Sequence, residues 1–402
     1  MRRPQSGHRQ KPRVAFFVTV DWYFASHYLA LACAIRDAGY AVSVITDGDA
    51  YSEQIRSAGI DLIPFQISRQ GMHPVAELKS LLRLIGVLRR LRPDLLHNIA
   101  QKPVLYGSLA ARLTGVPAVV AALPGLGWLF TSGVPRARLG RRFVLLGYRY
   151  LLRQRRVRVL VQNQTDRTEL KQLAGLDAIL IPGSGVDLER YQPHPPAPLP
   201  VTVMLASRLL WDKGIGELVE AMRLLRERGI ACRCCLIGEP DDGNPASVSR
   251  QWLEERVAEG IIEWWGYRDN MPAALRQAHI ACLPSYREGM PKFLLEASAA
   301  GLPLVATDVP GCRDIVQSGT SGLLVPPRDA AALADALQRL IEDAKLRSQL
   351  GTQARAIAEA RFGTERIAVI VKDVYRALLT KSGHHSDRRS SSRKPTSTYT
   401  EK

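Results

Sequence analysis

The segment Tyr286–Gly301 reads YREGMPKFLLEASAAG, follows the apolar run HIACLPS, and separates Glu288 from Glu296 by seven residues. On a single helix this spacing would leave the two carboxylates on different faces. We therefore expect HIACLPS to be a buried strand, with Glu288 on the loop at its carboxyl end. Pro291 suits the first turn of a following helix that carries Glu296. Because a helix N-terminus attracts anions, this arrangement predicts a site for an anionic ligand.

The same strand–helix alternation extends through most of the chain. From Arg13 onward, short β-rich runs such as VAFFVTV and AVSVIT alternate with amphipathic stretches, which predicts parallel βαβ units. The pattern pauses at the proline cluster Pro193–Pro200 and restarts at VTVMLAS. We therefore expect an α/β fold with two doubly wound, Rossmann-like domains that face a cleft. The predicted divisions are a first domain at 13–190, a second at 200–365, a C-terminal helix at 366–381 that packs back on the first domain, and a disordered tail at 382–402.

Charge is distributed unevenly along the 402 residues. Up to Leu180 the chain has 26 Lys and Arg against 11 Asp and Glu, whereas the remainder has 29 against 27. The first half is therefore expected to meet an anionic partner. Around 136–158, arginines interleave with apolar and aromatic residues, which suits an anionic membrane surface, although a solvated face over an ordinary core helix stays open. The residues expected to face the membrane are Arg141, Arg142, Arg149, Arg153, Arg155 and Arg156.

Several other features argue against competing classes of site. The six cysteines lack zinc-site spacing and indicate buried thiols in a reducing compartment. The first residues lack the apolar core of a signal peptide, and prolines interrupt the uncharged stretch 113–130, so no spanning helix is expected. The acidic DGD at Asp47–Asp49 suits a turn better than a metal site, and GLG at Gly125–Gly127 lacks the third glycine of a dinucleotide fingerprint. We expect neither a metal nor a redox cofactor.

Fixed positive charge follows the first strand of the second domain. In ASRLLWDKG, Arg208 and Lys213 come just after the strand, and Gly214 allows the backbone to approach closely. An arginine and a lysine can stabilise a leaving diphosphate without a metal ion. Together with the two carboxylates and a helix N-terminus, this pattern suits a ligand made of a sugar, a diphosphate and a ribose.

These two motifs carry a family resemblance. SRLLWDKG together with YREGMPKFLLEASAAGLPLVATDVPGC resembles glycosyltransferase family 4, retaining enzymes of the GT-B fold, and the resemblance runs from about Val14 to Leu379. Within that family, HNIAQKPVLYGSLAARLTGVP and LPGLGWLF resemble a bacterial subgroup. Its members extend sugars on undecaprenyl diphosphate for O-antigen, capsule or protein glycosylation.

The resemblance implies roles for individual residues. Arg208 and Lys213 would hold the donor diphosphate, Glu296 would bind the ribose hydroxyls, and Glu288 would contact the donor sugar. The loop between the two glutamates would meet the sugar or the phosphate through Gly289, Met290 and Pro291.

The acceptor side departs from the family pattern. Many members have a cleft histidine at the position of Ile99, which leaves His97 as the nearest catalytic candidate, with a structural strand-end histidine as the alternative. The first-strand loop VDWYFASH lacks the glycine pair that many members use there. The acceptor-side candidates are Ser26, His27, Lys102 and Tyr106.

The expected function is a metal-independent, retaining hexosyl transfer, with a UDP-linked N-acetylhexosamine as donor and an undecaprenyl-diphosphate-linked sugar as acceptor. The enzyme would be cytoplasmic and peripherally attached to the inner face of the bacterial plasma membrane. Three alternatives stay open: a transferase acting on another glycolipid, a nucleotide-sugar epimerase of the same fold, and a basic nucleic-acid-binding protein. The last has no recognised motif in this chain, so no nucleic-acid partner is expected.

Overall fold

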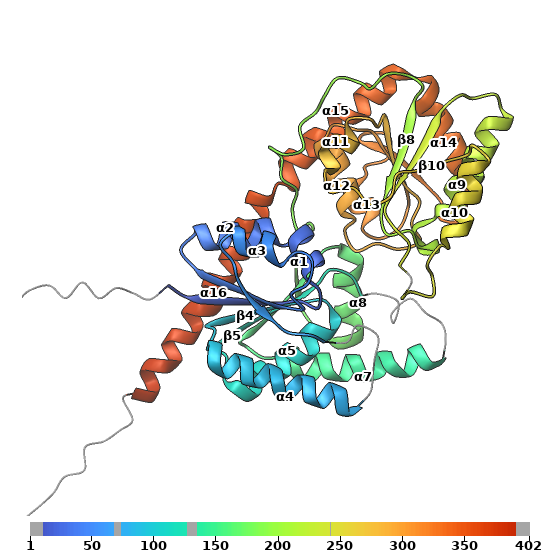
Figure 1. Cartoon of the computed structure of the whole chain (residues 1–402). Coiled ribbons are helices and arrows are strands. Elements are labelled where there is room, and N and C mark those ends of the chain that lie inside the picture. The colour runs from blue at the N-terminus through green and yellow to red at the C-terminus, as the bar shows by residue number, and fades with distance from the viewer. Residues whose placement is uncertain (1–10, 68–73, 127–134, 242, 391–402) are drawn as a thin grey trace, which may run out of the picture.

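The computed structural model describes residues 11–67, 74–126, 135–241 and 243–390. Two domains stand one beside the other, and each has a parallel sheet with helices on both faces (Figure 1). This confirms the predicted α/β class with two doubly wound domains.

The first domain contains a parallel sheet of seven strands. Their order across the sheet is β3-β2-β1-β4-β5-β6-β7, so the winding direction reverses between β1 and β4. In doubly wound sheets, ligands bind at the carboxyl ends of the strands near such a reversal. The strands are β1 (Arg13–Phe17), β2 (Ala41–Thr46), β3 (Asp61–Pro64), β4 (Leu95–Ile99), β5 (Ala118–Leu123), β6 (Val157–Val161) and β7 (Ala178–Leu180).

Two helical layers enclose this sheet. One layer consists of α4 (Pro74–Leu91), α5 (Gln101–Thr114), α7 (Pro135–Leu152) and α8 (Gln164–Ala174). The other consists of α1 (Asp21–His27), α2 (Leu29–Asp37), α3 (Ser52–Ser57) and α16 (Thr364–Ser390) (Figure 1). Alternate residues of β1 point to opposite faces of the sheet. Ala15 and Phe17 pack toward α4 and α5, whereas Val14 and Phe16 pack toward α2 and α16.

The second domain repeats this plan with six parallel strands in the order β10-β9-β8-β11-β12-β13, and its reversal lies between β8 and β11. The strands are β8 (Thr202–Ala206), β9 (Arg233–Ile237), β10 (Glu263–Trp264), β11 (Ile280–Leu283), β12 (Leu304–Thr307) and β13 (Gly322–Val325). The helices are η1 (Trp211–Lys213), α9 (Ile215–Glu227), α10 (Arg250–Ala258), α11 (Met271–Leu275), α12 (Lys292–Ala299), α13 (Cys312–Ile315), α14 (Ala330–Glu342) and α15 (Ala344–Arg361). The cysteine-rich run CRCCLIG contains β9, in which Cys234 and Cys235 are buried and free, whereas Cys232 before the strand is half-buried.

The chain passes between the domains twice, and the two passages are hydrogen-bonded to each other. The Val186 N–H donates to the Phe362 carbonyl at 2.8 Å, and the Thr364 N–H donates to the Val186 carbonyl at 3.0 Å. After the second passage, α16 returns to the first domain and buries Tyr375 there (Figure 1). The first domain is therefore built from both ends of the described chain.

The C-terminal helix is longer than expected. It runs from Thr364 to Ser390, so the backbone of residues 382–390 is helical where disorder was predicted. No proline occurs between Thr364 and Ser390, and the next one is Pro395. Polar composition alone does not end a helix that is already formed. The rest of the predicted tail, 391–402, lies outside the described residues. Among the helices that are described, none is both long enough and apolar enough to cross a bilayer.

Candidate functional site

The two glutamates of the opening motif lie on different elements. β11 ends at Leu283, the chain then forms a loop that carries Glu288, and α12 begins at Lys292 and carries Glu296. Pro291 is the N-cap residue of α12, one position before the first turn in which it was expected. The carboxyl end of β11 borders the reversal point of the sheet, so this loop occupies the ligand-binding edge of the second domain.

Glu288 is held by two side chains of its own domain. Lys213 Nζ donates to Glu288 Oε1 at 2.6 Å, and Ser285 Oγ donates to the same oxygen at 2.7 Å. Lys213 ends the short helix η1 after β8, and Gly214 follows it with a φ of 72°. A Cβ at Gly214 would lie 2.1 Å from the Pro284 carbonyl oxygen, so only glycine lets η1 pack against the end of β11.

Glu296 is buried and has two partners. Its side chain accepts a hydrogen bond from the Tyr191 hydroxyl at 2.6 Å and pairs with Lys292, which lies one turn earlier on α12. Burial and the neighbouring charge of Glu296 raise the pKa of Tyr191. Tyr191 belongs to the segment between the two domains, so this contact ties α12 to the interdomain connection.

Three basic side chains gather at this edge of the second domain. Arg208 follows β8 and forms an ion pair with Asp241 at 2.8 Å, while its side chain stays 45% exposed. Lys213 and Lys292 pair with the two glutamates. We call Arg208, Lys213 and Lys292 the basic cluster. Its charges are balanced by carboxylates, so an anionic ligand would replace or share those partners.

Ser26 and His27 of the first domain lie across from the basic cluster. Ser26 Oγ is 2.6 Å from His27 Nδ1, and the His27 ring packs on that of Tyr23 with 4.3 Å between centroids. Burial, with smaller contributions from the charges of Lys292 and Lys213, lowers the pKa of His27 to about 3. The end of α1 therefore faces the basic cluster, and the imidazole of His27 is neutral at pH 7.

Lys102 and Tyr106 form a separate group with Glu77. Lys102 Nζ donates to Glu77 Oε1 at 2.6 Å and lies 5.8 Å from the centroid of the Tyr106 ring. Burial and the Glu77 carboxylate raise the pKa of Tyr106 to about 12. The group joins the beginnings of α4 and α5, at the carboxyl edge of the first sheet.

His97 is buried within the first domain. It lies within β4 and is 1% exposed; its Nδ1 is 2.6 Å from the Tyr375 hydroxyl, and its ring stacks on Phe16 at 4.9 Å. Burial lowers its pKa to about 3. The alternation of side chains along β4 directs this ring toward α16, which fits the structural alternative, and a catalytic role for His97 stays a prediction. Ile99, at the end of the strand, is also fully buried.

The acidic DGD segment takes part in hydrogen bonds with nearby backbone N–H groups. Asp47 Oδ1 accepts the Asp21 N–H at 2.8 Å, and Asp21 Oδ2 in turn accepts the Tyr51 N–H at 2.9 Å. Burial raises the pKa of Asp47. These contacts fit the turn interpretation of the segment that ends at Asp49. Among the described residues, no group of three or more His, Cys, Asp or Glu side chains is arranged to hold a metal ion.

The six arginines expected to face a membrane do not share one surface. Three of them bond to carbonyls of neighbouring loops: Arg149 to Leu173, Arg153 to Gly175 and Arg156 to Val116. Because β6 begins at Val157, the run Arg153–Arg156 precedes that strand and lies at the amino edge of the sheet, away from the second domain. Arg153, Arg155 and Arg156 therefore lie at the opposite edge of the first sheet from the site.

A different surface combines basic and apolar side chains. Arg141 and Arg142 lie on α7 with Phe143, Leu146 and Tyr150, which are 66%, 58% and 62% exposed. On α4, Val75, Leu78 and Leu82 are 58%, 57% and 59% exposed, and α5 packs between the two helices (Figure 1). We call these residues of α4 and α7 the apolar-basic face.

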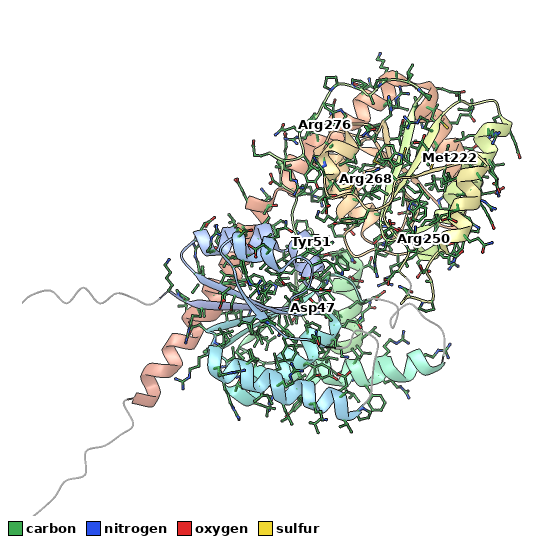
Figure 2. All side chains as sticks on the ribbon, in the orientation of Figure 1. Asp47, Tyr51, Met222, Arg250, Arg268 and Arg276 are labelled. Carbon is green, nitrogen blue, oxygen red and sulfur yellow. The ribbon has the colours of Figure 1, made fainter. Side chains whose placement is uncertain are left out.

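Direct contacts bring the carboxyl edges of the two sheets together. A Cβ added to Gly289 would lie 1.7 Å from the Pro124 carbonyl oxygen, so the two loops meet backbone to backbone. At a second point, the hydroxyls of Tyr51 and Tyr267 are 2.7 Å apart, and Figure 2 shows Tyr51 where the first domain meets the second.

Some residues of the site were not predicted from the sequence. Lys292 precedes Glu296 by four positions, a spacing that indicates an ion pair on a helix and was available in the sequence. Tyr191 and Asp241 had no such signal, because they lie 105 and 33 positions from their partners Glu296 and Arg208.

Comparison with known proteins identifies relatives of both domains. Residues 13–163 match the family model described as glycosyl transferase 4-like, and residues 200–343 match glycosyl transferases group 1. The N,N'-diacetylbacillosaminyl-diphospho-undecaprenol alpha-1,3-N-acetylgalactosaminyltransferase of Campylobacter jejuni is 28% identical over 338 residues, which cover 80% of this chain and 87% of that protein. The capsular polysaccharide biosynthesis glycosyltransferase CapM of Staphylococcus aureus is 23% identical, over 76% of this chain and 83% of its own length.

Solved structures show the same fold. Anabaena HepE in complex with UDP and glucose superposes with a TM-score of 0.75 at 19% identity, covering 90% of this chain and 99% of that one. Sucrose-phosphate synthase from Thermosynechococcus elongatus has a TM-score of 0.77 at 23% identity, covering 92% of this chain and all of that one. Both similarities support a two-domain GT-B fold.

Proposed function

The chain belongs to the glycosyltransferases: a glycosyl transferase 4-like domain is followed by a domain of the glycosyl transferases group 1. From this premise we propose a specific reaction. A UDP-linked N-acetylhexosamine is the donor, and the acceptor is a sugar already attached to undecaprenyl diphosphate in the assembly of a surface polysaccharide or glycan. The observation that carries this proposal is the basic cluster beside Glu288 and Glu296, at the reversal point of the second sheet. The similarity to the Campylobacter transferase along most of both chains supports the acceptor class.

The basic cluster suits a leaving diphosphate. In the proposed reaction, the C–O bond between the donor sugar and the diphosphate breaks, and its electron pair leaves with UDP. The oxygen of the acceptor hydroxyl forms the new glycosidic bond, and its proton passes to the leaving UDP. Arg208 and Lys213 stabilise the charge that develops on UDP, Glu296 binds the ribose hydroxyls, and Glu288 contacts the donor sugar. We propose that the anomeric configuration is retained.

We also propose that the reaction needs no metal ion, since the basic cluster supplies the charge that a divalent ion would supply elsewhere. Turnover in EDTA should equal turnover in Mg²⁺ or Mn²⁺ within about twofold. Full dependence on an added divalent ion would refute this part of the proposal and would direct attention to Asp47 and Asp49.

The acceptor is proposed to come from the membrane, to which the first domain binds. The apolar-basic face supports this, because exposed apolar side chains next to arginines suit insertion at an anionic lipid surface. α4 follows β3, so its first residues lie at the carboxyl edge of the sheet, where the group formed by Lys102, Tyr106 and Glu77 also lies. A membrane at this face would place the lipid diphosphate beside the site, at the inner face of the bacterial plasma membrane.

Vesicle co-sedimentation tests the membrane contact. Replacing Leu78, Phe143 and Leu146 with Ser should release the protein from anionic vesicles, and replacing Arg141 and Arg142 with Ser should weaken binding most at low salt. A matched control replaces Arg153 and Arg155 with Ser, and it should bind like the wild type. Equal binding of all variants, or equal binding of the wild type to neutral and anionic vesicles, would contradict this surface.

A donor screen tests the reaction itself. UDP-N-acetylgalactosamine, UDP-N-acetylglucosamine, UDP-glucose and UDP-galactose are each offered with an undecaprenyl-diphosphate N-acetylhexosamine, and UDP release is measured with and without this acceptor. The proposal expects acceptor-dependent UDP release and a product with the anomeric configuration of the donor. Interconversion of UDP-sugars without acceptor would favour the epimerase. Activity only with another glycolipid would favour a different transferase, and tight binding of nucleic acid without sugar transfer would favour the third alternative.

A further inference from the structure

We propose that Arg287, Asn163 and Asp166 are positioning residues, which hold the loop of Glu288 in place from the opposite domain. Glu288 would then be fixed for turnover only while the two domains are in contact. This inference rests on the proposed function, because it takes Glu288 as a group that contacts the donor sugar.

The residue before Glu288 is anchored to the first domain by an ion pair. Arg287 Nη2 donates to Asp166 Oδ1 at 2.8 Å and lies 3.2 Å from Glu169 Oε2. Both carboxylates belong to α8, whereas Arg287 belongs to the loop after β11. The Asp166 side chain is 2% exposed and that of Arg287 is 24% exposed, so water screens this pair only weakly.

The residue after Glu288 is anchored to the same helix. Asn163 is the N-cap residue of α8, where its Oδ1 accepts the Asp166 N–H at 2.8 Å. Its Nδ2 donates to Asp166 Oδ2 at 2.9 Å and to the Gly289 carbonyl at 3.0 Å. One asparagine therefore caps α8, orients the partner of Arg287 and bonds the backbone of the donor loop.

Asp166 depends on these contacts. Burial raises its pKa, while the hydrogen bond from Asn163 and the charge of Arg287 act in the opposite direction. A buried carboxylate that loses its partner is strongly destabilised, so Asp166 attracts Arg287 to this position when the domains close. The contact of Gly289 with the backbone of Pro124 and Gly125 prevents the loop from moving closer to the first domain.

The two sets of contacts around Glu288 have different origins. Its carboxylate is held by Lys213 and Ser285 of its own domain, whereas the backbone on either side of it is held by α8 of the other domain. Separation of the domains would release the backbone and leave the basic cluster intact. Nucleotide binding should therefore tolerate loss of the α8 contacts, and turnover should not.

The test compares UDP affinity with turnover in Arg287→Ala and Asn163→Ala. We expect the Kd of UDP to stay within about twofold of wild type, while kcat falls roughly 10- to 100-fold, the range associated with misplacing a reacting group by about 1 Å. Arg287→Lys should restore part of kcat, since a lysine keeps the positive charge but lacks the planar guanidinium of arginine. Asp166→Asn combined with Arg287→Ala should lower kcat no further than Arg287→Ala alone.

Two controls separate positioning from general effects. Arg228→Ala removes an arginine that also bonds two side chains, Asp335 at 2.7 Å and Gln338 at 2.9 Å, on α14 outside the junction. Tyr51→Phe removes a different interdomain hydrogen bond and leaves the donor loop untouched. Both variants should keep kcat within about threefold of wild type.

Several results would overturn the proposal: folded Arg287→Ala with wild-type kcat, a loss of UDP affinity that matches the loss of kcat, or Tyr51→Phe as impaired as Arg287→Ala. If Arg287→Ala does not fold, Arg287→Lys and Glu169→Gln take its place in the same comparison.

UDP release without acceptor is measured in parallel, because it reports slow hydrolysis of the donor. A wild type that hydrolyses donor but transfers to no undecaprenyl acceptor would refute the proposed function, while its variants would still decide whether α8 positions Glu288.

Discussion

Replacing Gly289 with Ala should separate the loops of the two domains without disturbing either core. The new Cβ would lie 1.7 Å from the Pro124 carbonyl oxygen and 3.3 Å from the Gly125 Cα, and both are backbone atoms. Reaching an ordinary contact distance requires a displacement of about 1.5 Å at this point. The hydrogen bond from Asn163 to the Gly289 carbonyl, now 3.0 Å, would not survive that shift. We expect kcat to fall roughly 100-fold, since about 1 Å of misplacement can have that effect.

The assay for Gly289→Ala combines kinetics with thermal unfolding. Initial rates of UDP release give kcat and KM, and calorimetry reports whether the cores have changed. Gly86→Ala is the matched control, because a Cβ at that helical position meets nothing within 4 Å. This control should keep full activity and gain up to about 1 kcal/mol of stability from the better helix propensity of alanine. A Gly289→Ala enzyme that stays within threefold of wild type in kcat would refute the reasoning about the junction.

The remaining predictions concern single groups. Lys213→Ala should lower kcat roughly 100-fold in EDTA, because it removes one charge-stabilising group, and wild-type turnover in this variant would exclude Lys213 from the reaction. Tyr375→Phe should lower the free energy of unfolding by about 1 to 3 kcal/mol in urea titrations, since it leaves the Nδ1 of buried His97 without its partner; an unchanged value would contradict the structural role of that bond. The pKa of His97 is lowered to about 3 in the folded protein, so between that value and the ordinary value near 6.5 the unfolded chain binds more protons. Stability should therefore decrease as the pH falls below about 6.5, by up to roughly 1.4 kcal/mol per pH unit from this group, and His97→Phe should show a shallower dependence in the same titrations.

The fold and the placement of the donor motifs were predictable from the sequence because both depend on local patterns. Buried parallel strands are apolar runs, and the residues that follow them lie at the carboxyl edge of a sheet. That rule alone placed Arg208 after β8 and Glu288 after β11, at the reversal of the second sheet. The proline at position 291 and the apolar residues after it predicted the helix that carries Glu296 to within one residue of its start.

The features that the sequence could not predict depend on contacts between distant segments. The sequence alone left a catalytic and a structural role open for His97, because its partner Tyr375 lies nearly 280 positions later, on α16. The arginines around Arg156 follow an amphipathic helix in the sequence, and only the sheet topology shows that they lie at the amino edge. The pair between Arg287 and Asp166 spans 121 positions and leaves no periodic signal, because each residue fits its own segment as an ordinary charged residue.

The return of α16 to the first domain has a consequence for how the polypeptide is made. Helices α1 to α3 cover only part of their face of the first sheet, and the rest is covered by Ile367, Val371 and Tyr375, which are among the last described residues to leave the ribosome. The first domain therefore cannot complete its core, and keeps an apolar strip exposed, until the entire second domain has been translated. A chain cut short after α15 would keep every group of the basic cluster and still lack a finished first domain.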